Sequence, residues 1–341
     1  MNKSLTRRRL FAATSGLLAT PAIVRAAESF RIRCSLDTAP AHMRGQSIQA
    51  YLKALEAGSD GRIKTELFNA GALFKDANVT KALVQGQVEM AAPGTWVLTG
   101  FIADCDFASL PALYGQPIGV VRKAIDGKSG QHINDQLRNK LKLQVLGPWL
   151  ELGMQHWYSS TKPIKSYADL KGMKIRNAGG AALAWRTRFF EAIPNTTAWP
   201  DVPLALSQGT FDGLITTNES CSSAQLWEAG VKYAMLDHQN LNAYVPLIAD
   251  AFFNTLPADL QKLVLNTWAA HIADYRANMA HAQELALTNL RAHNIAVVEI
   301  GDAEIAAVRA RMMPAQDKLI KGLKMTPELP KLLMADLGSS V

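Results

Sequence analysis

Short runs in which apolar and polar residues alternate are separated by longer segments with a helical rhythm. Residues 30–36 alternate as a strand does, residues 44–58 carry apolar side chains three or four positions apart, and residues 63–68 alternate again. A helix over residues 76–86 and a short buried strand over residues 88–92 extend this to a β-α-β-α-β series. Such a series predicts a mostly parallel sheet with helices on its faces.

A second series of the same kind begins after Pro163. Before it, the pattern predicts helices over residues 116–125 and 129–141 and a strand over residues 142–149. The second series contains strands over residues 173–176, 196–199 and 213–217 and helices over residues 180–192, 202–208 and 222–229. Two such series predict two α/β lobes, with a cleft between them that closes on a small ligand.

One segment exceeds the length of a typical globular helix. Residues 258–291 favour a helix throughout, Pro257 stands where helices begin, and no further proline occurs before Pro314. This helix either runs across both lobes or breaks near Ala273. The predicted division of the chain is as follows: residues 27–152 with about 241–275 form one lobe, and residues 153–240 with about 276–341 form the other.

The first 26 residues are typical of an export signal. Residues 6–11, Thr-Arg-Arg-Arg-Leu-Phe, have the twin-arginine pattern, and residues 24–26 suit a signal peptidase. The apolar stretch between them, residues 10–24, is too short and too polar to span a bilayer. We therefore expect a twin-arginine signal peptide over residues 1–26, export by the Tat machinery, and a mature chain that acts outside the cytoplasm.

Charge and composition exclude several classes of function. The chain of 341 residues has a net charge of +7, but the leader holds five basic residues and no acid, so the mature chain carries +2. No basic run interleaved with aromatic residues remains, which argues against nucleic-acid binding. No later run reaches about 18 apolar residues, so we expect no transmembrane span.

The sequence offers no motif for catalysis, for a cofactor or for a metal. It contains no GxSxG, HExxH, GxxxxGK[ST] or GxGxxG sequence, and its seven histidines are scattered. Cys34, Cys105 and Cys221 have no metal-ligand spacing. We interpret them as small buried apolar residues, with one disulfide as the alternative.

A nearly continuous block of motifs carries a resemblance to a known family. Residues 169–176 read Asp-Leu-Lys-Gly-Met-Lys-Ile-Arg, and residues 203–213 read Pro-Leu-Ala-Leu-Ser-Gln-Gly-Thr-Phe-Asp-Gly. Agreement continues in residues 61–73, 82–91 and 109–111. The chain resembles the solute-binding proteins of tripartite ATP-independent periplasmic (TRAP) transporters, typified by the dicarboxylate-binding protein DctP.

This resemblance implies a fold, a location and a function. It implies the two-lobed periplasmic-binding-protein fold, in which each lobe is a mostly parallel sheet flanked by helices. It further implies a periplasmic receptor that captures an organic acid and delivers it to small and large membrane permease subunits. In the family, the arginine that corresponds to Arg176 grips the ligand carboxylate, a task that suits a planar guanidinium. Without the resemblance, Arg176 would be interpreted as a sheet-edge arginine paired with a surface acid.

The sequence departs from the family at two places. Some relatives have a second arginine about twenty residues before Arg176, where this chain has residues 153–158 and offers His156 or Trp157. After residue 213, where many relatives have Gln-Glu-Asn, this chain offers polar side chains whose role the sequence leaves open. The further candidate ligand contacts are Thr95, Trp96, Trp199, Thr216, Thr217 and Asn218, and core packing is the alternative for each tryptophan. His42 is a candidate for the edge of the cleft, or else a surface histidine.

Other functions stay open as alternatives. A ligand-sensing protein that presents its closed form to a receptor would use the same cleft, and a periplasmic enzyme would need a nucleophile or an acid/base pair that no motif supplies. One carboxylate anchor in an aromatic, weakly charged pocket predicts an organic acid with a polar or an apolar tail. Keto, hydroxy and aromatic monocarboxylates fit this prediction at least as well as a four-carbon dicarboxylate.

Overall fold

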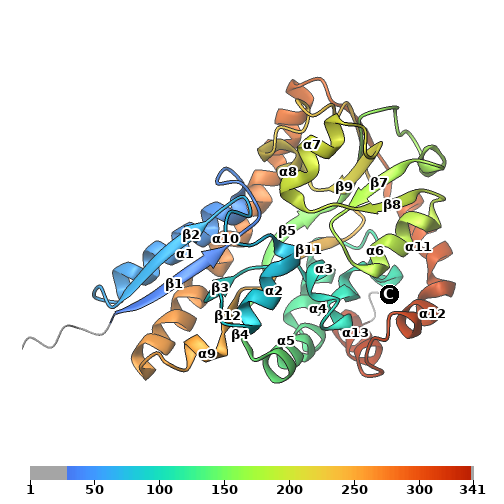
Figure 1. Cartoon of the computed structure of the whole chain (residues 1–341). Helices are drawn as coiled ribbons and strands as arrows, with labels where there is room; N and C mark the ends of the chain where they lie inside the picture. The colour runs from blue at the N-terminus through green and yellow to red at the C-terminus, as the bar shows by residue number, and fades with distance from the viewer. Residues whose placement is uncertain (1–28, 339–341) are drawn as a thin grey trace, which may run out of the picture.

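The computed structural model describes residues 29–338 and contains two lobes, each built on one sheet (Figure 1). The predicted signal peptide lies outside these residues. The first sheet has the strand order β2-β1-β3-β12-β4. Its strands are β1 (Phe30–Ser35), β2 (Ile63–Phe68), β3 (Met90–Ala91), β4 (Leu143–Val145) and β12 (Leu247–Ala249). The pairs β1–β2 and β1–β3 are parallel, as expected, whereas β12 runs antiparallel to both of its neighbours.

The second sheet has the order β13-β10-β6-β9-β7-β8. Its strands are β6 (His156–Ser159), β7 (Lys174–Asn177), β8 (Ile193–Thr196), β9 (Gly213–Thr216), β10 (Tyr233–Leu236) and β13 (Ala296–Glu299). Strand β6 is antiparallel to β9 and β10, so this sheet is mixed as well. A separate antiparallel pair, β5 (Leu150–Met154) with β11 (Leu241–Tyr244), carries the chain between the lobes.

Helices cover both faces of each sheet and bury its apolar side chains. The helices of the first lobe are α1 (Met43–Gly58), α2 (Asp76–Val84), α3 (Thr95–Leu98), α4 (Ile118–Asp126), α5 (Lys128–Leu141) and α9 (Asp250–Phe253). Those of the second lobe are α6 (Ala181–Phe189), α7 (Val202–Ser207), α8 (Asn218–Ser223) and α11 (Asp302–Met312). In α1 the buried residues Ile48, Tyr51, Leu52 and Leu55 have the spacing that the sequence predicts for one face of a helix.

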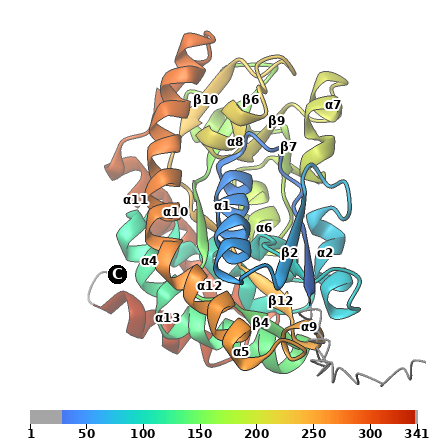
Figure 2. The ribbon, with the colours of Figure 1, turned by 90° about the vertical axis from the view of Figure 1, so that its left-hand side faces the viewer.

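Helix α10 (Ala258–Ala292) runs unbroken for 35 residues along both lobes, as one of the two alternatives predicted (Figure 2). Its interior contains neither glycine nor proline. Leu260, Val264 and Trp268 belong to the core of the first lobe, whereas Leu290 belongs to the core of the second. The helix therefore ties the two lobes together.

The C-terminal helices lie on a different lobe from the one predicted. Helices α12 (Gln316–Gly322) and α13 (Leu329–Leu337) were expected in the second lobe, but α13 packs against α4 and α5 of the first. Leu329, Leu333 and Leu337 recur every fourth residue and form one apolar stripe, which is buried in the first lobe's core. The chain thus crosses back to the first lobe after α11.

Two predicted elements are displaced along the chain. The strand expected over residues 196–199 is β8, which ends at Thr196, and Trp199 begins a short 3-10 helix. The helix expected over residues 222–229 is α8, which begins four residues earlier. Its start is fixed by Thr217, whose side chain accepts a hydrogen bond from the backbone N–H of Ser220.

The three cysteines are buried and unpaired, in agreement with their interpretation as small apolar residues. Burial raises the pKa of the Cys34 thiol to about 12. Among helices within residues 29–338, none is long and apolar enough to cross a membrane.

Candidate functional site

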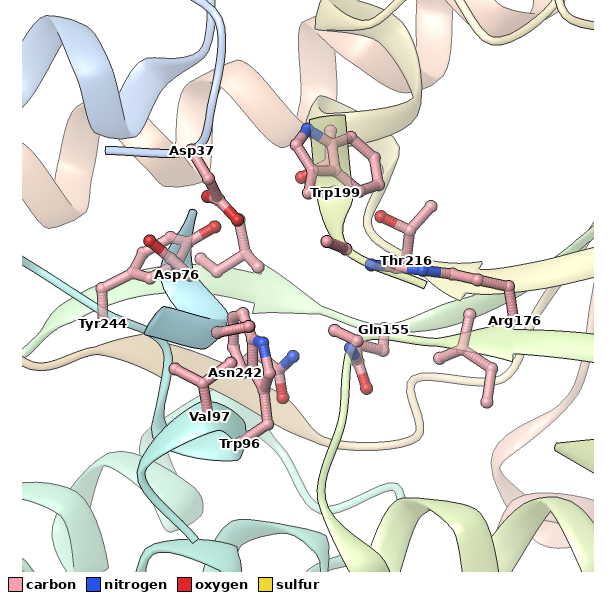
Figure 3. Close-up of a pocket in the computed structure, with 16 residues that line it drawn as sticks. Asp37, Asp76, Trp96, Val97, Gln155, Arg176, Trp199, Thr216, Asn242 and Tyr244 are labelled. Carbon is pink, nitrogen blue, oxygen red and sulfur yellow. The ribbon is translucent and has the colours of Figure 1, made fainter. Parts of the chain in front are cut away.

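A cavity lies between the two lobes and the crossing strands β5 and β11 (Figure 3). Several of its residues follow or end parallel strands: Asp37 follows β1, Arg176 lies on β7 and Thr216 ends β9. Ligands of α/β proteins bind at these carboxyl ends. The polar and aromatic residues that line the cavity are Asp37, Asp76, Trp96, Gln155, Arg176, Trp199, Thr216, Ser220, Asn242 and Tyr244.

Arg176 brings a positive charge into this cavity. The residue is only 2% exposed, and its Nε and Nη2 atoms donate to the backbone oxygen of Thr197 at 2.9 and 2.7 Å. Within the part of the chain that the structure describes, its guanidinium forms no ion pair. Burial lowers the pKa of Arg176 to about 10, although the charge of Asp37 in the same cavity opposes this shift, and Arg176 stays charged at neutral pH. A buried cation without a direct ion pair is costly, and an anionic ligand would reduce that cost.

An aromatic ring limits the movement of this arginine. The Trp199 ring centroid lies 5.4 Å from Cζ of Arg176, within the range of a cation–π interaction. The carbonyl of Thr197 and the ring of Trp199 hold the guanidinium before any ligand arrives. Preorganised donors of this kind lose less entropy when they bind a carboxylate.

The first lobe places two carboxyl groups at the other side of the cavity, as Figure 3 shows. Arg44 is fully buried and donates from Nη1 to Asp37 and from Nη2 to Asp76, both at 2.9 Å. The Cζ atom of Arg44 lies 4.0 Å from the ring centroid of Tyr244. Burial and the neighbouring Asp76 raise the pKa of Asp37 to about 7, although Arg44 opposes this shift.

The lobes touch each other directly around the cavity, so the structure is a closed form. At the mouth, Lys75 Nζ lies 2.7 Å from Asp201 Oδ2. On the inner side, the backbone N–H of Met43 donates to Glu219 Oε1 at 2.8 Å. His42, which is only 1% exposed, places its Nε2 atom 3.0 Å from Ser220 Oγ. His42 therefore lies at a lobe-to-lobe contact and not on the surface.

A further contact joins the lobes beside the cavity. Asp106 of the first lobe accepts a hydrogen bond at 2.8 Å from the backbone N–H of Ala182, in the first turn of α6. Gly180, with a φ of 85°, permits this approach, since a Cβ atom there would lie 2.6 Å from Asp106 Oδ1. A carboxylate suits the positive end of a helix, so this contact adds to the closed arrangement.

Comparison with known proteins decides the family. Residues 35–322 match the family described as bacterial extracellular solute-binding protein, family 7. The chain belongs to this family. It is 26% identical over 326 residues to the C4-dicarboxylate-binding periplasmic protein DctP of Rhodobacter capsulatus, covering 92% of this chain and 94% of that protein.

The similar proteins are named for a range of solutes. The 2,3-diketo-L-gulonate-binding periplasmic protein YiaO of Escherichia coli is 24% identical over 285 residues, covering 83% of this chain and 85% of that protein. The structure of the sugar acid binding protein DctPAm from Advenella mimigardefordensis, with galactonate, has a TM-score of 0.84 and 22% identity, covering 91% and 98% of the two chains. A protein from Shewanella oneidensis with bound succinate has a TM-score of 0.83, 22% identity, and coverage of 91% and 100%. These likenesses show that the fold is shared.

Four of the predicted contact residues line the cavity of this family 7 member: Trp96, Arg176, Trp199 and Thr216. The other five do not line it. Trp157 lies in the second lobe's core, where its indole N–H donates to Asp237 at 2.7 Å, and Thr217 caps α8. Thr95 is buried at the start of α3. The ligand roles of all nine residues stay predictions.

His156 and Asn218 line a second cavity, on the side of β5 that faces α10. His156 Nδ1 accepts a hydrogen bond from the backbone N–H of His238 at 3.2 Å, and burial holds the pKa of His156 well below its usual value. Asn218 accepts a hydrogen bond from the hydroxyl group of Tyr158 at 2.5 Å. Gln155, one residue before His156, reaches the cavity between the lobes instead.

Sequence reasoning missed six polar or aromatic residues of the cavity: Asp37, Asp76, Gln155, Ser220, Asn242 and Tyr244. Two of them had a usable signal. Asp37 follows the first predicted strand, and Asp76 is the first residue of the second predicted helix. Side chains at such positions face the carboxyl ends of parallel strands. Asn242 and Tyr244 lie on β11, a strand that the pattern did not predict.

Proposed function

We propose that this chain is the periplasmic receptor of a TRAP transporter and that it binds an organic acid by its carboxylate. The buried guanidinium of Arg176, without a carboxylate partner in residues 29–338 and facing the cavity between the lobes, is the observation that carries the proposal. Membership of an extracellular solute-binding family supports it, as do relatives whose names refer to carboxylates. The receptor then delivers the acid to the small and large permease subunits.

The energy of binding comes from contacts that only the closed form completes. A carboxylate on Arg176 gains two charge-assisted hydrogen bonds, each contributing roughly 1.5–3 kcal/mol when shielded from water. The shielding is supplied by the first lobe, which contributes Trp96, Asp37 and Asp76 to the same cavity. A ligand that contacts both lobes therefore shifts the population towards the closed form, the form that we expect the permease to recognise.

Thermal unfolding of residues 27–341 with a panel of organic acids tests the proposal. A ligand that binds the native state raises the Tm in proportion to RT ln(1 + [L]/Kd). Arg176→Ala should weaken binding of the best acid at least about a hundredfold, and Arg176→Lys should weaken it less, because lysine keeps the charge but not the paired donors. Arg188→Ala, on an exposed position of α6, is the matched control.

Two results would contradict the proposal. A panel in which no carboxylate raises the Tm would remove the ligand class, and an Arg176→Ala variant that binds as tightly as the parent would remove the anchor. Export is tested separately by replacing Arg7 and Arg8 with lysine, which should leave the uncleaved precursor in the cytoplasm. Correct export of that variant would show that the leader is not a twin-arginine signal.

A further inference from the structure

The cavity between the lobes has opposite chemistry at its two ends. We propose that its ligand is a compact monocarboxylate with a hydrogen-bond donor, a hydroxyl or an ammonium group, at the end away from Arg176, and that dicarboxylates are disfavoured. Asp37 and Asp76 would receive that donor. This inference rests on the proposed function, because it takes the carboxylate on Arg176 as given.

The first-lobe end of the cavity carries more acid than base. Asp37 and Asp76 lie beside each other in Figure 3, and Arg44 is the arginine that pairs with both, through Oδ1 of each. Their side chains are only 8% and 4% exposed, so little water screens them. Two carboxyl groups share Arg44, and the charge of Asp37 also acts on Arg176 across the cavity. Once a ligand carboxylate engages Arg176, one negative charge is left to be matched, either by a proton or by a donor on the ligand.

A neighbouring side chain points to the same ligand chemistry. Gln155 is 2% exposed and lines the cavity, and its Oε1 atom is buried without a hydrogen-bond partner in the described part of the chain. A buried acceptor that lacks a partner is costly, so a donor on the ligand would be favoured there as well. Arg176 is a buried donor without an ion-pair partner in the described part of the chain, so it favours an anionic acceptor on the ligand.

The size of the cavity limits the length of the ligand. In the closed form about 50 Å³ is open, which corresponds to roughly four water molecules. A short acid can therefore reach from Arg176 towards Asp37 and Asp76, whereas a long chain would hold the lobes apart. A compact dicarboxylate would place its second negative charge beside two acids whose shared Arg44 is already engaged.

The test uses two matched series of short acids that differ only at the far end. The four-carbon series is butanoate, 4-hydroxybutanoate, 4-aminobutanoate and succinate; the five-carbon series is pentanoate, 5-hydroxypentanoate, 5-aminopentanoate and glutarate. Binding is measured by titration calorimetry on residues 27–341. In at least one series, the hydroxyalkanoate or the aminoalkanoate should bind at least about tenfold tighter than both the dicarboxylate and the alkanoate. Comparison of the hydroxy acid with the amino acid identifies which donor the site prefers.

Two variants connect this preference to the acid pair. Asp37→Asn and Asp76→Asn should each reduce the preference for the donor over the dicarboxylate by about tenfold, whereas Asp317→Asn, at an exposed position of α12, should leave it unchanged. The parent protein alone decides the question if either variant fails to fold.

The inference is overturned if a dicarboxylate or an alkanoate binds best in both series, or if neither series binds at all. These outcomes are distinct from failure of the proposed function. If succinate binds best and Arg176→Ala abolishes its binding, the receptor proposal stands and only the far-end assignment falls. If no carboxylate of the wider panel binds, both fall.

Discussion

The buried lobe-to-lobe contact at Glu219 should control ligand affinity although Glu219 does not line the ligand cavity. Glu219 lies in α8 of the second lobe and accepts the backbone N–H of Met43, at the start of α1 in the first lobe, at 2.8 Å. The residue is 4% exposed. An open form would break this contact, so Glu219→Ala should destabilise the closed form selectively.

The hydrogen bond from Met43 sets the minimum size of the effect, because Glu219 Oε2 also lies 2.9 Å from Nε2 of His42 in the first lobe. A hydrogen bond to a charged group contributes roughly 1.5–3 kcal/mol, which corresponds to about a 10- to 150-fold change in the closing equilibrium. If only the closed form binds the ligand and it is the less populated form in the free protein, the apparent Kd rises by the same factor. The exposed pair Lys75–Asp201 also joins the lobes, but an exposed ion pair contributes only about 0–1 kcal/mol, so Lys75→Ala should raise the Kd less than about sixfold.

Titration calorimetry with the tightest-binding acid measures both variants, and small-angle X-ray scattering with and without that acid measures closure. We expect Glu219→Ala to need more ligand to close and to reach the same compact form at saturation. The effect of Lys75→Ala should disappear at high salt, because the charges are exposed. The reasoning is refuted if Glu219→Ala binds as tightly as the parent, or if Lys75→Ala has the larger effect at low salt.

Two further predictions concern Asp237 and Trp199. Asp237 is fully buried, and burial raises its pKa to about 7. The folded state therefore binds this proton more tightly than the unfolded state does. The resulting contribution to stability is lost as the pH rises from about 4 to 7. Asp237→Asn should flatten the pH dependence of urea unfolding over this window by up to about 4 kcal/mol, and the parts due to Asp37 and Asp106 should remain. An unaltered profile would contradict the assignment. Trp199→Phe should reduce the change in tryptophan fluorescence that accompanies ligand binding. Trp185→Phe, which lies outside the cavity, should leave this change as it is. Equal effects of the two substitutions would place the ligand away from Arg176.

The sequence predicted segments of the site better than single residues. The stretch around residue 155 was expected to face the ligand, but His156 was named where Gln155 lines the cavity. Alternate residues of a strand face opposite sides, so a shift of one residue changes the side completely. Gln155 lies between β5, which ends at Met154, and β6, which begins at His156, and no local pattern shows which side chain of such a junction faces the ligand.

Three of the strands that were missed share a physical cause. Strands β5, β11 and β12 are short and buried along their whole length, so they have no alternation that periodicity can detect. The long helix α10, in contrast, was predicted almost to its ends, because it depends on local propensity over many residues and on the absence of proline and glycine.

The two ends of the ligand cavity belong to different lobes, and this arrangement makes closure depend on the ligand. Arg176 lies on the second lobe and the Asp37–Asp76 pair on the first, while α10 is packed into both cores. Because the shared helix and the β5–β11 pair keep the lobes attached, opening must bend this region rather than separate the lobes freely. An acid that fits only one end gains only one set of contacts and shifts the equilibrium little. A ligand that satisfies both ends gains its full binding energy only in the closed form, so the same charges that select the ligand also drive the conformational change.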